Sequence, residues 1–323
     1  MNSSFVIPLF ERFAREKGIK IHVEPTYRFV AQLTLPDGRV RYVGTHIDGV
    51  NDAGATEIAR DKTYTLHFLK KAGITIPEGR AFFSKGYAAY LGSDLSSKAA
   101  WKYASEIGLP VILKPNSKSQ GRGVWKIHSQ QELEAATQDL DAWVDIYRIE
   151  RFCEGRDYRV VVYDGEVVCA YERIPLNICG DGESTIEELL KKKQGVIDVH
   201  DRRIEWSLKR NILSYDTVLE NGRMFMLLSN ANLSSGGDAR DVTNTIHEDY
   251  IKLALRCARM MALKLCGLDI LIEGDSSKQA PVTVIEANAG PGLAHYASLG
   301  EVQYARVEKM YSKIFDSIIT SPQ

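Results

Sequence analysis

The chain has 323 residues, enough for about two domains or for one large domain with a lid. Hydrophobic residues make up 44% of it and charged residues 26%, as in an ordinary soluble globular protein. The formal net charge of -1 argues against a basic nucleic-acid-binding protein and against a polybasic membrane-binding one. No apolar run approaches the roughly 20 residues of a membrane span, and no basic leader precedes the first apolar stretch, so a signal peptide is not expected.

Secondary-structure patterns are mixed along the chain. Helices are expected at residues 5–17, 51–71, 96–107, 128–140, 185–193 and 247–266. Strands are expected at residues 19–25, 29–35, 39–47, 111–114, 224–233, 268–274 and 284–288, with a hairpin at 157–174 that turns at Asp164-Gly165. Helices combined with mostly antiparallel strand pairs predict an α+β or α/β organisation with several sheets.

The five cysteines are Cys153, Cys169, Cys179, Cys257 and Cys266. Their number is odd and no two have Cys-x-x-Cys spacing, so neither a disulfide framework nor a structural zinc site is predicted. The pattern fits a reducing cytoplasm, where free cysteine is mostly a small buried hydrophobic residue. We therefore expect a cytoplasmic protein without a nucleophilic cysteine.

A polar loop follows the strand-like run that ends at Lys114. It contains Ser117, Ser119, Gly121 and Gly123. Glycines let backbone N–H groups approach an anion closely, and serine hydroxyls add hydrogen-bond donors. The segment is not a P-loop, because Gly-Lys-Ser/Thr is absent and a strand, not a helix, follows. Phosphate binding and a flexible polar hairpin tip are both consistent with it.

Two further segments carry polar residues at strand ends. Glu150 ends one element and Asp157 begins a strong strand, where carboxylates can accept hydrogen bonds from an adenine amine and ribose hydroxyls, although such residues are more often ordinary surface acids. The segment NANLSSGGDARD contains Asn230, Asn232 and Arg240 and can form a second anion-binding loop.

Residues 284–292, VIEANAGPG, end a strand with a carboxylate and a carboxamide two positions apart. Glu286 and Asn288 therefore face the same side of the strand. If this strand pairs with the run that contains Asp269, three oxygen ligands converge, which suits a hard cation such as magnesium. The alternative is a strand end that turns polar as it meets solvent.

The order of these motifs carries a resemblance. The segments DKTYTLHFLKKAGITIPEG, VILKPNSKSQGRGV, EGRDYRVVVYDGEVV, ERIPLNICGDGESTIEELL, NANLSSGGDARDVT and VIEANAGPGL look like those of an ATP-grasp ligase. More narrowly, the chain resembles the ATP-grasp domain of cyanophycin synthetase and of fused bacterial glutathione-synthesising enzymes, over roughly residues 57–310. The resemblance implies an ATP-grasp fold of class α+β (α/β), with the nucleotide held between two α+β subdomains.

The resemblance also implies a domain division. A small N-terminal α/β subdomain on the substrate side would cover residues 1–75. A central lid subdomain with the phosphate loop would cover 76–150, and a C-terminal subdomain with the metal site would cover 151–323. Cyanophycin synthetase has a larger N-terminal domain and a second ligase domain, whereas this chain stops soon after the predicted metal strand. We therefore expect a stand-alone, single-step ligase. The region from Gln194 to Tyr215 looks shorter than its counterpart.

Carried over by position, the nucleotide-binding residues come first. Lys62 and Lys114 would contact the phosphates and the adenine side, and residues 117–123 would close over the β- and γ-phosphates. Glu150 would bind the adenine amine, and Asp157 would bind the ribose.

The resemblance assigns metal and catalytic roles as well. Asp269, Glu286 and Asn288 would hold two Mg²⁺ ions, with Mn²⁺ as an alternative. Arg173 and the loop of residues 230–237, which contains Asn230 and Asn232, would face the γ-phosphate and an acyl phosphate, with Arg240 nearby.

The implied reaction joins a carboxylate to an amine with ATP giving ADP, on amino acid or small peptide substrates. The basic residues Arg173, Arg202, Arg203, Arg210 and Arg240 suit an acidic substrate, but the group at 202–210 is equally consistent with a solvated basic face. A ligase acting on a peptide or protein tail and a non-catalytic nucleotide-binding protein are the alternatives. We expect a homo-oligomer, in the first instance a dimer, with no nucleic-acid or membrane partner.

Overall fold

The structure is a computed structural model, and it describes residues 4–44, 49–118, 121–193, 198–228, 231 and 236–321. Ser119, Asn230 and Asn232, which the sequence assigns to the two anion-binding loops, lie outside the described residues. Within the described ranges no helix is both long enough and apolar enough to cross a membrane.

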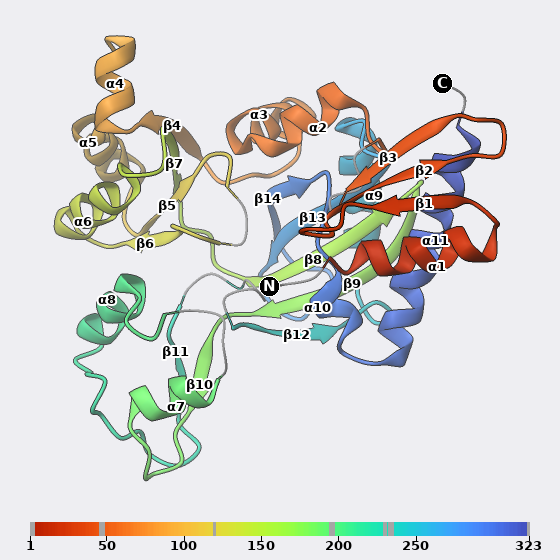
Figure 1. The fold of residues 1–323 in the computed structure, drawn as a ribbon. Helices are drawn as coiled ribbons and strands as arrows, with labels where there is room; N and C mark the ends of the chain where they lie inside the picture. Colours follow the sequence, from red (N-terminus) through yellow and green to blue (C-terminus); the bar gives the residue numbers. More distant parts are fainter. Residues whose placement is uncertain are drawn as a thin grey trace.

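A five-stranded antiparallel sheet occupies the centre of the molecule (Figure 1). Its strands, in spatial order, are β12 (Asp238–Asp241), β9 (Glu166–Ile174), β8 (Arg156–Tyr163), β13 (Leu265–Ile272) and β14 (Val282–Asn288). The hairpin between β8 and β9 turns at Asp164 and Gly165, as predicted, and both residues have the positive φ values of a tight hairpin turn. The sheet brings the predicted metal strands β13 and β14 together in register.

Three helices pack against this sheet through one hydrophobic cluster. They are α2 (Ala53–Arg60), α3 (Lys62–Lys71) and α9 (Glu248–Met260). The single helix expected at residues 51–71 is therefore wrong: Asp61 is extended, and its side chain accepts a hydrogen bond from the Tyr64 amide, so a new helix starts at Lys62. The helix expected to reach residue 266 is also too long, because α9 ends at Met260 and Ala262 has a positive φ.

The lid is a four-stranded antiparallel sheet covered by helices (Figure 1). Its strands, in spatial order, are β4 (Gly79–Phe83), β7 (Ile146–Arg151), β5 (Val111–Pro115) and β6 (Trp125–Ile127). Its helices are α4 (Lys85–Leu91), α5 (Ser97–Ile107) and α6 (Gln130–Leu140). The buried residues of this part form a hydrophobic cluster of their own, separate from that of the central sheet.

A small satellite module lies below the lid in Figure 1. It comprises β10 (Asn177–Cys179), α7 (Ile186–Lys192), α8 (Arg202–Arg210) and β11 (Met224–Met226), which surround a separate hydrophobic cluster. Thr185 and Glu188 form a capping box that starts α7, in agreement with the predicted helix at 185–193. The strand expected at 224–233 ends at Met226, and α8 was not expected at all.

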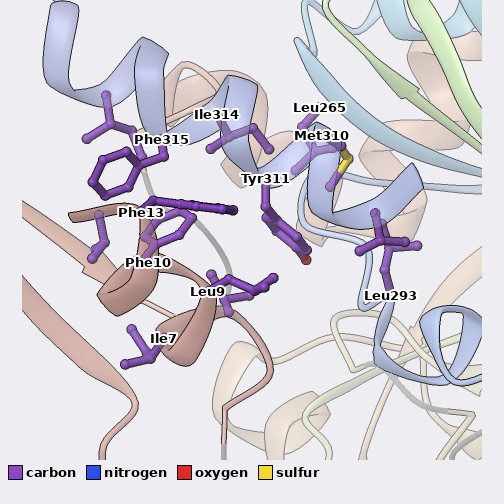
Figure 2. Close-up of a cluster of buried hydrophobic side chains, with 14 of the residues drawn as sticks. Ile7, Leu9, Phe10, Phe13, Leu265, Leu293, Met310, Tyr311, Ile314 and Phe315 are labelled. Carbon is purple, nitrogen blue, oxygen red and sulfur yellow. The ribbon is translucent and has the colours of Figure 1, made fainter. Parts of the chain in front are cut away.

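The N-terminal unit packs against the end of the chain (Figure 2). It comprises α1 (Val6–Glu16), β1 (Lys20–Val23), β2 (Val30–Thr34) and β3 (Val40–Gly44), and it meets α10 (Ala294–Ala297) and α11 (Glu301–Thr320). Phe10 is the centre of the contact: its ring lies edge-on to Phe315 at 5.2 Å and to Tyr311 at 6.4 Å. The division at residues 75 and 150 stays a prediction.

Replacing Phe10 by Ala should lower the free energy of unfolding by about 3–5 kcal/mol, because the ring is fully buried and its removal leaves a cavity. Urea unfolding followed by circular dichroism measures the change. Tyr42→Ala, in the same unit but 74% exposed, is the control and should cost much less. Equal losses in the two variants would contradict this description of the N-terminal core.

Candidate active site

A cavity of about 1120 Å³ lies between the central sheet, the lid and the satellite module. Its lining brings together residues that are far apart in the chain and that the sequence had singled out: Lys62, Lys114, Gly121, Glu150, Asp157, Arg173, Arg240, Asp269, Glu286 and Asn288. Of the remaining predicted site residues that the structure describes, Ser117 and Gly123 are not part of this lining.

Lys62 bridges the central sheet and the phosphate loop. It is the first residue of α3, and its amide donates to the carbonyl of Asn116, at the end of β5. Its Nζ lies 3.0 Å from Oε1 of Glu286 and donates to the carbonyl of Lys118 at 2.7 Å. The ammonium group is therefore held between a predicted metal ligand and the loop expected to cover the phosphates.

Asn116 lies behind the cavity wall, next to Lys62, and was not identified from the sequence. It is 2% exposed. Its Oδ1 accepts from the amide and the hydroxyl of Thr63, and its Nδ2 donates to Oδ2 of Asp61 at 2.6 Å. Because Asn116 joins the end of the lid strand β5 to the start of α3, it fixes where Lys62 enters the cavity.

Lys114 is buried in a three-charge cluster. Its Nζ lies 2.6 Å from Oε1 of Glu150, and Nε of Arg148 lies 3.0 Å from the other oxygen, Oε2. Glu150 and Lys114 come from the neighbouring strands β7 and β5. Both oxygens of Glu150 thus already accept from cations, and an adenine amine would have to share them.

Two arginines and two aspartates on the strands β9, β8 and β13 form one network of ion pairs. Arg159 donates to both oxygens of Asp269, from Nε and Nη2, each at 2.7 Å. Arg173 donates to Oδ1 of Asp157 at 2.7 Å, and its Nη2 lies 3.0 Å from Oδ2 of Asp269. Register places them there, because Asp157 pairs with Arg173 and Arg159 pairs with Asp269.

This network shifts the pKa values of its members in opposite directions. Burial raises the pKa of Asp157 to about 6 against the pull of Arg173, and the negative charge of Asp269 adds to the rise. Burial also opposes ionisation of Asp269, but Arg159 and Arg173 together hold its pKa below the usual value. Burial opposes the charge of both arginines, but Asp269 raises the pKa of Arg159, and Asp157 and Asp269 together raise the pKa of Arg173.

The ends of β13 and β14 place the three predicted metal ligands next to one another. Asp269 pairs with Glu286, and Gly267 pairs with Asn288. The register shifts at a bulge between Asp269 and Ile270. Gly267 allows the turn after β14 to pack closely, because a Cβ there would lie 2.6 Å from Cβ of Pro291. Glu286 and Asn288 both line the cavity, so the prediction that they share a face is confirmed.

The chemistry of these donors suits Mg²⁺. Glu286 is partly exposed to the cavity, and Asn288 lies beside Asp269, with Nδ2 3.4 Å from its Oδ2. Two carboxylates and a carboxamide are the oxygen donors that a hard cation prefers. Asp269 shares its oxygens with two arginines, and no cluster of three His, Cys, Asp or Glu side chains suited to a metal exists among the described residues. The set therefore leaves most coordination positions to phosphate oxygens and water.

Arg240 lies at another part of the cavity wall, on the edge strand β12. It forms an ion pair with Glu172, which is opposite it on β9, and Arg156 approaches the same carboxylate at 3.8 Å. Arg240 is more than half exposed. An exposed guanidinium at the cavity edge can bind a substrate carboxylate or a phosphate.

The basic group at residues 202–210 is not a uniformly solvated face. Arg203 and Arg210 form ion pairs with Asp201 and Glu132, whereas Arg202 is exposed. None of the three arginines is part of the cavity lining. The geometry therefore does not favour their direct contact with a substrate.

Other cationic residues at the cavity were not identified from the sequence: Arg122, Lys126, Arg151, Arg156 and Arg159. Arg159 had a detectable signal, because it stands two positions after Asp157 on the same strand and therefore faces the same side. Lys126 lies over the ring of Phe152 at 3.5 Å, and burial lowers its pKa.

Comparison with known families identifies the domain. The family model of the RimK-like ATP-grasp domain matches residues 59–184 and 227–307, which is most of the chain. The chain belongs to the RimK-like ATP-grasp family. The two matched segments include the lysines, the phosphate loop and the metal strands, and they leave out residues 185–226 of the satellite module.

Curated relatives are larger proteins. The chain is 33% identical over 297 residues to cyanophycin synthetase of Trichormus variabilis, in an alignment that covers 87% of this chain and 31% of the relative. It is 29% identical over 309 residues to the bifunctional glutathione biosynthesis protein of Clostridium perfringens, covering 87% of this chain and 37% of the relative. The chain thus spans about a third of the length of these relatives.

Solved structures confirm the fold. A bifunctional glutathione synthetase from Pasteurella multocida matches 96% of this chain and 45% of its own, with a TM-score of 0.56 and 22% identity. The D-alanine–D-alanine ligase from Bacillus anthracis matches 83% of this chain and 69% of its own, with a TM-score of 0.52 and 16% identity. The predicted ATP-grasp family and α+β fold are confirmed.

Relatives and solved neighbours with this fold are named as synthetases or ligases, which agrees with the expected ATP-grasp ligase. The roles of individual site residues, the homo-oligomeric state and the cytoplasmic location stay predictions.

Replacing Glu150 by Gln should lower the free energy of unfolding by about 3–5 kcal/mol, because Lys114 and Arg148 would stay buried without a counter-charge. Urea unfolding without nucleotide measures it. Glu78→Gln is the matched control: its ion pair with Arg151 is about half exposed at both ends and should contribute about 1 kcal/mol or less. A Glu150→Gln variant as stable as the parent would show that the cluster is not a tightly coupled unit.

Proposed function

We propose that this chain is an ATP-dependent carboxylate–amine ligase that forms an amide bond, on amino acid or small peptide substrates, through an acyl phosphate. The observation that supports this most is one cavity that is lined both by two buried lysines, Lys62 and Lys114, and by the oxygen donors Asp269, Glu286 and Asn288. Positive charge for phosphates and oxygen donors for a cation are the two requirements of phosphoryl transfer from a nucleotide.

In this proposal the nucleotide lies between the lid and the central sheet. Lys62 and Lys114 contact the phosphates and the adenine side, Glu150 accepts from the adenine amine, and Asp157 accepts from the ribose hydroxyls. Residues 117–123 close over the β- and γ-phosphates. The positions support this, since the four side chains and Gly121 line one cavity.

Asp269, Glu286 and Asn288 would hold Mg²⁺, two ions in our proposal. Bound there, the metal would neutralise charge on the phosphates during transfer. Arg159 orients the carboxylate of Asp269 through two hydrogen bonds, and Asp269, Glu286 and Asn288 all line the cavity. Arg159 is thus a positioning residue for this site.

The reaction needs no nucleophile from the protein. An oxygen of the substrate carboxylate attacks the γ-phosphorus and ADP leaves. The substrate amine then attacks the acyl carbon, loses a proton, and displaces phosphate as the amide forms. Arg173 stabilises the charge that develops on the transferring group, and Arg240 with the 230–237 loop holds the acyl phosphate. Arg173 on β9 and Arg240 on β12 both line the cavity, which supports these two roles.

Turnover with ATP and Mg²⁺ against a matrix of amino acids and dipeptides should yield ADP, phosphate and an amide whose mass is the sum of the substrates less one water. Nucleotide products are separated by chromatography and the amide is measured by mass spectrometry. AMP and pyrophosphate would overturn the acyl-phosphate route. Turnover only with a peptide or protein acceptor would favour a tail-modifying ligase, and nucleotide binding without any turnover would favour a non-catalytic protein.

Replacing Glu286 by Gln should remove the Mg²⁺ dependence of ATP binding and lower turnover by about 10²–10³-fold, because the cation loses a charged ligand that faces the cavity. Titration of ATP with and without Mg²⁺ measures the first effect. Glu273→Gln, an exposed carboxylate just beyond β13, is the control for charge. A Glu286→Gln variant with the parent's Mg²⁺ dependence would remove this residue from the metal site.

A further inference from the structure

Helix α8 connects the satellite module to the lid. Its Ile204 and Leu208 are buried in the satellite cluster, while Trp206 packs against the hydrophobic cluster of the lid. At its C-terminal end Arg210 lies 3.0 Å from Oε1 of Glu132 on α6. Figure 1 shows α8 directly below the lid strands and α6. The helix belongs to the segment that the family model leaves out.

The first turn of α8 makes a specific contact with the phosphate loop. Arg203 donates from Nη1 to the carbonyl of Gly121 at 2.8 Å. Its other two nitrogens are occupied by one carboxylate: Nε lies 2.9 Å from Oδ1 of Asp201, and Nη2 lies 2.8 Å from Oδ2. Because Nε and Nη2 pair with one carboxylate, the plane of the guanidinium is fixed, and Nη1 is directed at the Gly121 carbonyl. The Arg203 side chain is 12% exposed, so this contact is largely shielded from water.

Gly121 is where the loop meets both the cavity and α8. It lines the cavity, and its carbonyl also accepts from the Val124 amide at 3.3 Å. Two residues later the chain is held by packing, since a Cβ on Gly123 would lie 2.6 Å from Cδ2 of Leu140 and 3.0 Å from the Trp143 ring. The loop is therefore anchored to the lid at Gly123 and to α8 at Gly121.

We propose that the Asp201–Arg203 pair is a latch that positions the phosphate loop over the cavity through the Gly121 carbonyl. This inference rests on the proposed function, in which residues 117–123 cover the phosphates. Moving Gly121 away from the cavity to admit or release a nucleotide breaks the bond from Arg203 to its carbonyl. The satellite module then acts on the reaction without touching the substrate, and Arg203 is a positioning residue.

The latch is tested first in the ligand-free protein by hydrogen exchange of peptides that cover residues 117–128. Arg203→Gln and Asp201→Asn should each raise exchange at Gly123 and Val124 by about tenfold, because one charge-assisted hydrogen bond is lost or loses its orientation. Asp201 also caps α8 by accepting from the Arg203 amide, and Asn retains that role. Arg202→Gln removes the same charge from an exposed neighbour and should leave exchange unchanged.

The second readout is the dissociation rate of a fluorescent ATP analogue with Mg²⁺, measured by stopped flow. Arg203→Gln should release it about tenfold faster, and Arg203→Lys should not restore the parent rate, because an ammonium cannot pair with both oxygens of Asp201 while donating to Gly121. Unchanged thermal unfolding of all variants shows that the effect is confined to the loop.

The outcomes separate the two proposals. Exchange and analogue release in Arg203→Gln equal to those of Arg202→Gln would overturn the latch and leave the ligase proposal standing. A parent protein that binds no nucleotide would overturn the proposed function. Faster exchange confined to α8 itself, with residues 121–124 unchanged, would assign Asp201 and Arg203 to helix stability and overturn the latch.

Discussion

The alternating network of Arg173, Asp157, Asp269 and Arg159 is the interaction on which the rest of the site depends. Taking each of these charges out of water costs several kcal/mol, and the cost is offset only because every carboxylate oxygen that faces inward meets a guanidinium at hydrogen-bond distance. The network ties β9, β8 and β13 together across the sheet. It also fixes the carboxylate of Asp269 on β13 beside the oxygen donors of β14, Glu286 and Asn288.

The site is assembled between layers that have separate hydrophobic cores. The central sheet and the lid bury different sets of apolar residues, and the contacts that join them at the cavity are polar. Lys62 reaches from α3 to Glu286 on one side and to the Lys118 carbonyl on the other. Polar contacts across such a boundary can open and close at modest cost, whereas each core stays packed. This arrangement suits a site that must admit a nucleotide and then exclude water.

Local patterns predicted most of the elements, and they failed where tertiary contacts outweigh local preference. The hairpin at Asp164-Gly165 and the capping box of α7 are local signals, and both are present. The expected helix from residue 51 to 71 is divided, because the side chain of Asp61 both caps α3 and accepts from Asn116 on the lid. Helix α8 escaped notice because its short apolar stripe is completed only by the satellite and lid cores.

The sequence by itself determined the family, because the order of the motifs along the chain is recorded in it. From strand-end positions it also singled out many, but not all, of the residues that line the cavity. Only the tertiary structure decided which charged side chain pairs with which partner. Arg159 was a surface-like strand residue until the register of β8 and β13 placed it against Asp269. Arg203 was one of several basic residues until the packing of α8 brought it to the Gly121 carbonyl. Both pairings depend on contacts between segments distant in the chain. The two-residue spacing of Arg159 from Asp157 indicates the face of β8 on which it lies, but no local spacing indicates its partner.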